Sequence, residues 1–142
     1  MGGMLRQFLS HLRLGPDEVA LIDTAAGLEH FGRGIERHCD RILGVIDPTF
    51  ASFKLAKAMD RIAADAGLDI AFVLNKTDAR VKAAMGDYLA ADRIIGEIPM
   101  SDGVFSASLE GRPIEHRLPE VRFLADRLEA EARDRVDHVE NP

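Results

Sequence analysis

The 142-residue chain has a single cysteine, Cys39, no tryptophan and one tyrosine. A lone cysteine excludes an internal disulfide and is typical of proteins from a reducing compartment. No apolar run approaches the roughly 20 residues that cross a bilayer. Arg6, His11 and Arg13 interrupt the N-terminal segment, so it lacks the uncharged core of a signal peptide. We therefore expect a cytoplasmic protein that does not enter a membrane.

The chain also has fewer basic than acidic residues. Eighteen Lys and Arg residues stand against 24 Asp and Glu residues, which gives a net charge of −6. That balance argues against a nucleic acid or an anionic membrane surface as partner. The apolar content of 46% and the charged content of 30% are those of a folded globular chain. The length suits one domain with a buried core.

Short apolar runs followed by turn residues predict buried strands. Continuous rather than alternating apolar runs are typical of parallel strands that helices cover on both faces. Polar residues that follow such strands gather where open α/β sheets bind their ligands. The expected strands are Val19–Ile22, Ile42–Ile46, Ile70–Leu74 and Ile94–Ile98.

Amphipathic segments between these runs predict helices. Apolar side chains recur at three- and four-residue steps in the clearest case, which Gly67 is placed to end. The long C-terminal helix has a predicted buried stripe of Val121, Leu124, Ala125, Leu128, Ala132 and Val136. The expected helices are Met4–Leu14, Ser52–Ala66, Ala79–Ala91 and one that begins at Pro119.

The alternation of helices and strands predicts an α/β fold with a parallel sheet and right-handed crossovers. We expect residues 1–142 to form a single domain, with residues 134–142 as a frayed polar tail.

The segment Asp23-Thr24-Ala25-Ala26-Gly27 directly follows the first expected strand. An aspartate at a strand tip can hold a water molecule on Mg²⁺, and a nearby glycine lets a backbone N–H approach a γ-phosphate. Asp and Gly are also common at ordinary strand-end turns, so both interpretations stay open.

A second candidate, Asn75-Lys76-Thr77-Asp78, follows the third expected strand. The Asn75 amide and the Asp78 carboxylate can hydrogen-bond a nucleotide base. The alternative is a turn in which Asp78 caps the following helix. A third segment, from Ile98 to Gly103 and including Pro99, either lines a base pocket or simply leaves the strand.

A phosphate-binding Walker loop is absent from this sequence. Such a loop needs glycines, a lysine and a Ser or Thr. The nearest match, Gly27–Gly34, has Arg33 in place of the lysine and Gly34 in place of the hydroxyl, and we reject it. His30, His38 and Cys39 match no usual zinc spacing, although a small metal-carrying protein remains a third and weaker hypothesis.

The run VALIDTAAGLEHFGRGIERHCDRILGVIDPT, from Val19 to Thr49, resembles the switch II region of the CooC-type nickel-insertion ATPases of carbon monoxide dehydrogenase. These belong with the MinD/ParA-like deviant-Walker ATPases, which are P-loop NTPases of SIMIBI type. AGLEHFGRG is the specific part of the match, and the similarity covers most of the chain. The resemblance implies a P-loop-NTPase-like domain that is N-terminally truncated and lacks the Walker A loop.

The resemblance also implies roles for particular residues. Asp23 would hold Mg²⁺ through water, Gly27 would sense the γ-phosphate, and Thr24, Asn75 and Pro99 would lie at the nucleotide. The implied cofactor is Mg²⁺ with ATP. Because Asp78 completes an N-K-x-D string associated with guanine, GTP is not excluded.

ATP hydrolysis does not transfer with the resemblance, because the catalytic lysine is missing, and we expect weak or no activity. The implied partners are a homodimer mate, carbon monoxide dehydrogenase as the client, or a separate ATPase chain that carries the Walker loop. The rival hypothesis is a non-catalytic interaction or dimerisation module derived from such an ATPase.

Overall fold

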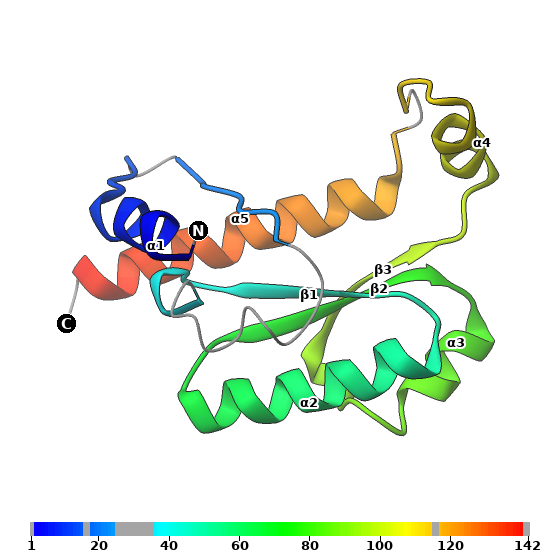
Figure 1. The fold of residues 1–142 in the computed structure, drawn as a ribbon, viewed down its shortest axis with the longest axis horizontal. Coiled ribbons are helices and arrows are strands. Elements are labelled where there is room, and N and C mark those ends of the chain that lie inside the picture. The colour runs from blue at the N-terminus through cyan, green and yellow to red at the C-terminus, as the bar shows by residue number, and fades with distance from the viewer. Residues whose placement is uncertain (1, 16–17, 25–35, 115–116, 141–142) are drawn as a thin grey trace.

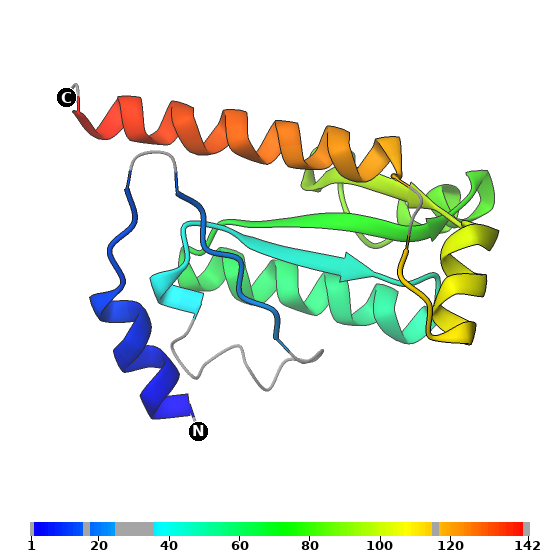
Figure 2. The same ribbon diagram turned by 90° about the horizontal axis from the view of Figure 1, so that it is seen from above.

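The computed structural model describes residues 2–15, 18–24, 36–114 and 117–140. Its centre is a parallel sheet of three strands in the order β1-β2-β3, with β1 at Ile42–Ile46, β2 at Ile70–Thr77 and β3 at Ile94–Pro99. Helices lie on both faces of this sheet (Figures 1 and 2). The parallel α/β fold is confirmed and is consistent with a P-loop-NTPase-like class. The central strand is buried from Ile70 to Leu74, as its continuous apolar run predicts.

The expected strand at Val19–Ile22 is wrong. The segment has no regular secondary structure, and the exposed fraction is 68% for Val19 and 88% for Leu21. A strand exists only where a neighbour satisfies its backbone N–H and C=O groups. Among the described residues, β1, β2 and β3 pair only with one another, and none of them pairs with Val19–Ile22. The apolar side chains of this segment are therefore not enough to make it a strand. Residues 25–35, which include Gly27 and His30, lie outside the described residues.

Helix α2 (Phe50–Ala66) covers one face of the sheet. Phe53, Ala56 and Ala63 are buried there against Phe72 and Leu74 of β2. The helix ends where Gly67 adopts φ +66°, a left-handed conformation that costs glycine little. The predicted helix and its terminator are both confirmed.

Helix α5 (Pro119–Glu140) covers the other face and begins at the predicted proline. Leu124 and Leu128 pack against Ala71, Val73 and Ile95. The other described residues of the predicted stripe are not buried: Val121 is 44% exposed, and Ala125 and Ala132 are also exposed. The side chain of Val136 lies outside the described part of the structure. The C-terminal part of α5 extends beyond the strands (Figure 2).

The remaining helices differ from expectation mainly at their ends. α1 (Gly2–His11) stops three residues before the expected Leu14, and α3 (Ala79–Met85) stops well before Ala91. α4 (Asp102–Glu110) has no counterpart among the expected helices. Short 3₁₀ turns at Glu36–His38 and Ala91–Arg93 lead into β1 and β3. No helix in the described part of the chain is long and apolar enough to cross a membrane.

Ion pairs fasten the amino ends of the strands. Arg41, which precedes β1, donates from Nε to Asp69, which precedes β2, at 3.0 Å. Arg41 also pairs with Glu131 of α5. Arg93, which precedes β3, pairs with Asp60 of α2 at 2.7 Å. We call this end of the sheet the amino edge.

Candidate functional site

The opposite end, which we call the carboxyl edge, collects the polar residues at the ends of β1, β2 and β3. Because the strands are parallel, their ends lie at one end of the sheet, which gathers Asp47 after β1, Asn75 and Asp78 at the end of β2, and Pro99 at the end of β3. Figure 1 shows helix α4 leaving from this end. Ligands of open α/β sheets bind at such an edge.

Side chains cap each helix that starts from the carboxyl edge. The Thr49 hydroxyl accepts from the Ser52 N–H at 3.1 Å, at the start of α2. The Asp78 carboxylate accepts from the Val81 N–H at 2.7 Å, at the start of α3. Ser101 accepts from the Val104 N–H at 3.3 Å, at the start of α4. Each cap satisfies one of the backbone donors that a helix N-terminus leaves free.

Asp47 joins the ends of β1 and β2. Its Oδ1 accepts from the Asn75 side-chain amide at 2.9 Å, and its Oδ2 accepts from the Lys76 ammonium at 3.0 Å. The hydrogen bond from Lys76, helped by that from Asn75 and by the charge of Lys76, holds the pKa of Asp47 below its ordinary value of 3.8. Burial opposes this lowering. Asp47 is therefore an ionised carboxylate at neutral pH, and each of its oxygens has a donor.

An irregularity in β2 allows both bonds. Consecutive residues of a regular strand point to opposite faces, so Asn75 and Lys76 would not ordinarily reach one carboxylate. Lys76 instead adopts φ +54°, and the register with β3 shifts between Asn75 and Thr77. Left-handed backbone at a non-glycine residue is uncommon and persists where surrounding contacts hold it. Here the salt bridge to Asp47 is such a contact.

The structure brings some predicted site residues together and not others. Asn75, Asp78 and Pro99 share the carboxyl edge. Asp23 and Thr24 are exposed in a segment without regular structure. Within the described residues, no hydrogen bond or ion pair connects them to the carboxyl edge. Gly27 lies outside the described residues, so its role stays a prediction, as do those of the others.

The metal candidates gain no support from geometry. His38 is exposed, Cys39 is partly buried, and His30 lies outside the described residues. Over the ranges that the structure describes, no group of three His, Cys, Asp or Glu residues is arranged to hold a metal ion. The carboxylate of Asp23 is exposed, and such an oxygen suits Mg²⁺, which keeps several of its waters when bound to protein.

The sequence did not predict that Asp47 would bind both Asn75 and Lys76 at the carboxyl edge, and Asp47 was interpreted as a turn residue. The signal was its place directly after a buried apolar run, the same signal that pointed to Asp23. The left-handed Lys76 had no sequence signal, because lysine is not a residue that favours positive φ.

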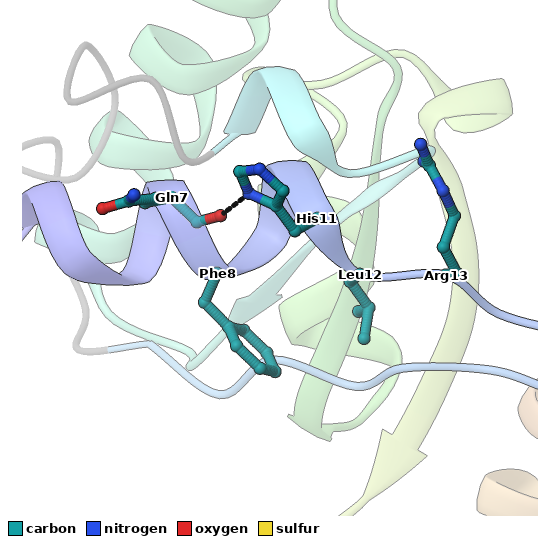
Figure 3. Close-up of a pocket in the computed structure, with 5 residues that line it drawn as sticks. All are labelled: Gln7, Phe8, His11, Leu12 and Arg13. Carbon is teal, nitrogen blue, oxygen red and sulfur yellow. Dashed lines mark hydrogen bonds between the residues drawn. The ribbon is translucent and has the colours of Figure 1, made fainter.

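Two hollows on the described surface are lined by residues other than those predicted for the site. One is formed on α1 by Gln7, Phe8, His11, Leu12 and Arg13, where His11 Nδ1 hydrogen-bonds to the Gln7 carbonyl oxygen at 2.8 Å (Figure 3). α1 lies toward the amino edge (Figure 2). A second hollow lies between β3 and the start of α5, at Gly96, Pro119 and Phe123. Neither contains a predicted site residue.

No protein-family model matches the chain. It is, however, 37% identical over 128 residues to an uncharacterized ATP-binding protein of Methanocaldococcus jannaschii, an alignment that covers 90% of this chain and 51% of that protein. A second uncharacterized ATP-binding protein of the same organism is 35% identical over 115 residues, which are 78% of this chain and 45% of the relative.

The carbon monoxide dehydrogenase accessory protein CooC of Rhodospirillum rubrum is 32% identical over 137 residues, which are 94% of this chain and 51% of that protein. The chain thus spans about half the length of the curated relatives it matches. The parallel α/β fold and these similarities together support an ATPase-like nucleotide-binding domain.

Proposed function

We propose that this chain contributes to an ATP site, with its carboxyl edge facing the base of the nucleotide. The observation that carries the proposal is the convergence of Asp47, Asn75, Asp78 and Pro99 at one end of a parallel sheet. Its similarity to two ATP-binding proteins over most of its own length supports the choice of nucleotide.

On the phosphate side, we assign Asp23 to Mg²⁺, through a bound water, and Gly27 to the γ-phosphate. Thr24, beside Asp23, would contact the same phosphates. The exposure of Asp23 and Thr24 leaves both side chains available for such contacts. Mg²⁺ would supply charge neutralisation of the phosphates. Because no Walker lysine is present in these 142 residues, we expect the chain by itself to hydrolyse ATP weakly or not at all.

The biological role we propose is nickel insertion during maturation of carbon monoxide dehydrogenase. Its support is the similarity to the CooC accessory protein along 94% of this chain. The proposal includes a homodimer and a client metalloenzyme as partners. The single cysteine supports a reducing compartment such as the cytoplasm as the place of action.

Calorimetric titration of the 142-residue chain with Mg·ATP and Mg·GTP tests the nucleotide proposal. We expect ATP to bind with a micromolar Kd and Asp23→Ala to weaken binding about tenfold or more, about 1.4 kcal/mol. The matched control is Asp65→Ala. It removes an exposed carboxylate that lies on α2, away from the proposed site, and should leave the Kd for ATP unchanged. No heat of binding at millimolar nucleotide would overturn the proposal.

Exposed apolar side chains favour a second candidate function, a non-catalytic interaction module. Val45 on the edge strand β1 is 64% exposed, and Val19 and Leu21 are more exposed still. Apolar surface of this kind at a sheet edge marks a site for association. The molar mass measured by light scattering over a range of protein concentrations distinguishes the interaction module from the nucleotide-binding function. Association without nucleotide, weakened by Val45→Thr, favours the module.

A further inference from the structure

We propose that Asp47 is a positioning residue that fixes the Asn75 side-chain amide for recognition of a nucleotide base. This inference rests on the proposed function, since it concerns the same carboxyl edge. It assigns a role to a residue that is not itself expected to touch the nucleotide.

The orientation of the Asn75 amide follows from chemistry. An ionised carboxylate has only acceptors, so the Asn75 atom that faces Asp47 Oδ1 at 2.9 Å must be the NH₂ group and not the carbonyl oxygen. A free asparagine side chain can turn its amide over at little cost. Asp47 removes that freedom, because a reversed amide would place oxygen against oxygen.

The Lys76 ammonium holds Asp47 in turn. Its bond to Oδ2 at 3.0 Å leaves Oδ1 for the amide and keeps the carboxylate ionised. The left-handed backbone of Lys76 lets these consecutive side chains reach the same partner. Asp47, Asn75 and Lys76 therefore form one connected unit, which we call the Asp47 clamp.

The clamp leaves Asn75 with one N–H donor and its carbonyl acceptor. An adjacent donor and acceptor match the N6 amine and N7 of adenine, which asparagine reads in a bidentate manner. Guanine presents two acceptors, O6 and N7, along the same edge, so a fixed amide would face one of them with its own oxygen. Because Asp47 occupies one N–H, Asn75 cannot turn both of its N–H groups toward the two guanine acceptors, so the clamp favours adenine over guanine.

Asp78 has a separate contact in the structure. One of its oxygens accepts from the Val81 N–H at 2.7 Å and caps α3. We assign the base preference to Asn75, and through it to Asp47.

The test compares Mg·ATP with Mg·tripolyphosphate, which has the phosphates but no base, on the wild-type chain and on variants. We expect Asp47→Ala to weaken ATP binding about tenfold and to leave tripolyphosphate binding unchanged, in line with the value of a good bidentate contact. Asn75→Ala should cause a similar loss. The double variant should lose no more than Asn75→Ala, because Asp47 acts through Asn75.

Asp60→Ala is the matched control. It breaks another partly buried aspartate pair, with Arg93 at the amino edge, and should lower stability without changing the ratio of the ATP and tripolyphosphate affinities. Side-chain amide resonances in the nucleotide-free chain give a second readout. The difference between the chemical shifts of the two Asn75 amide protons should be larger in the wild type, because one proton is bonded to Asp47, and should shrink toward that of a free asparagine in Asp47→Ala.

The outcomes separate this inference from the proposed function. Equal losses for ATP and tripolyphosphate, or an additional loss in the double variant, would overturn the positioning role while the nucleotide site stands. A wild-type chain that binds neither ligand overturns the proposed function, and the positioning role falls with it.

Discussion

The α-carbon of Gly44 on β1 lies against the ring of Phe72 on β2. The two residues are paired in the sheet, and a β-carbon at Gly44 would lie 2.6 Å from Cδ1 of the ring. Phe72 is completely buried, so its ring has no solvent to move into. The close approach of β1 to the buried ring therefore depends on a residue without a side chain.

Replacing Gly44 with alanine should destabilise the fold. We expect Gly44→Ala to lower the free energy of unfolding by about 1–3 kcal/mol, the usual cost of overpacking a core. Urea denaturation followed by circular dichroism measures the change. Gly86→Ala is the control, because its β-carbon would come no closer than 3.4 Å to the Ala83 carbonyl oxygen. Equal effects of the two variants would contradict the packing argument.

The ion pair between Arg41 and Glu131 should contribute to holding α5 on the sheet. Both side chains are partly buried, at 23% and 30% exposure, so their interaction is screened less than that of a surface pair. We expect Glu131→Ala, which also removes the partner of Arg127 at 2.9 Å on the same helix, to cost about 1 kcal/mol in unfolding free energy, at the upper end for exposed pairs. The same helix offers Glu129→Ala as a control, since Glu129 meets Arg133 only at 3.9 Å in solvent. A smaller loss for Glu131→Ala than for Glu129→Ala would show that the pair does not fasten the helix.

Protonation of Asp47 should weaken the fold only in acid. The Lys76 and Asn75 hydrogen bonds lower the pKa of Asp47 in the folded chain below 3.8, so the unfolded chain binds the proton more readily. The stabilisation is therefore complete above the ordinary carboxyl pKa and disappears as the pH falls through the lowered pKa. A ¹³C titration of the side-chain carboxyl should give a midpoint below 3.8. In addition, the stability difference between wild type and Asp47→Asn should shrink below that pH. A midpoint above 3.8 would contradict the clamp geometry.

Asp78 should act as a helix cap. Asp78→Ala removes the acceptor of the Val81 N–H and should cost about 1 kcal/mol, whereas Asp78→Asn keeps an acceptor there and should cost much less. Thermal unfolding measures both. If Asp78 reads guanine instead, Asp78→Asn would weaken GTP binding selectively while stability stays the same.

Much of the fold could be predicted from local pattern. The strands from Ile42, Ile70 and Ile94 and the helix that Gly67 ends are marked by continuous or periodic apolar residues with turn residues after them. Val19–Ile22 carries the same mark and is not a strand, because pairing depends on a neighbouring strand that a local window does not show.

Helix α4 is the opposite case, a helix that the sequence pattern did not predict. Ser101 and Asp102 are an N-cap and an acidic first turn, and Gly111 is the terminator, but Pro99 and Gly103 made the segment resemble a loop. Capping residues were the better guide here, since proline before a helix and glycine after it are compatible with helix boundaries.

The sequence predicted where the candidate site lies, but only some of the contacts within it. Parallel strands require that Asn75, Asp78 and Pro99 share one edge, so their positions follow from the fold class. The bonds of Asp47 depend on a left-handed Lys76 and a shifted register, which arise from tertiary contacts.

The separation of the amino edge from the carboxyl edge has a consequence for how this protein tolerates change. The ion pairs of Arg41 and Arg93 that fasten the sheet lie at the end opposite Asp47 and Asn75. Selection or design can therefore remodel the ligand-facing residues while the mechanical integrity of the domain is maintained from the far side. Libraries that randomise the carboxyl edge, but keep the helix caps Thr49, Asp78 and Ser101 and the amino edge, should retain a large fraction of folded members.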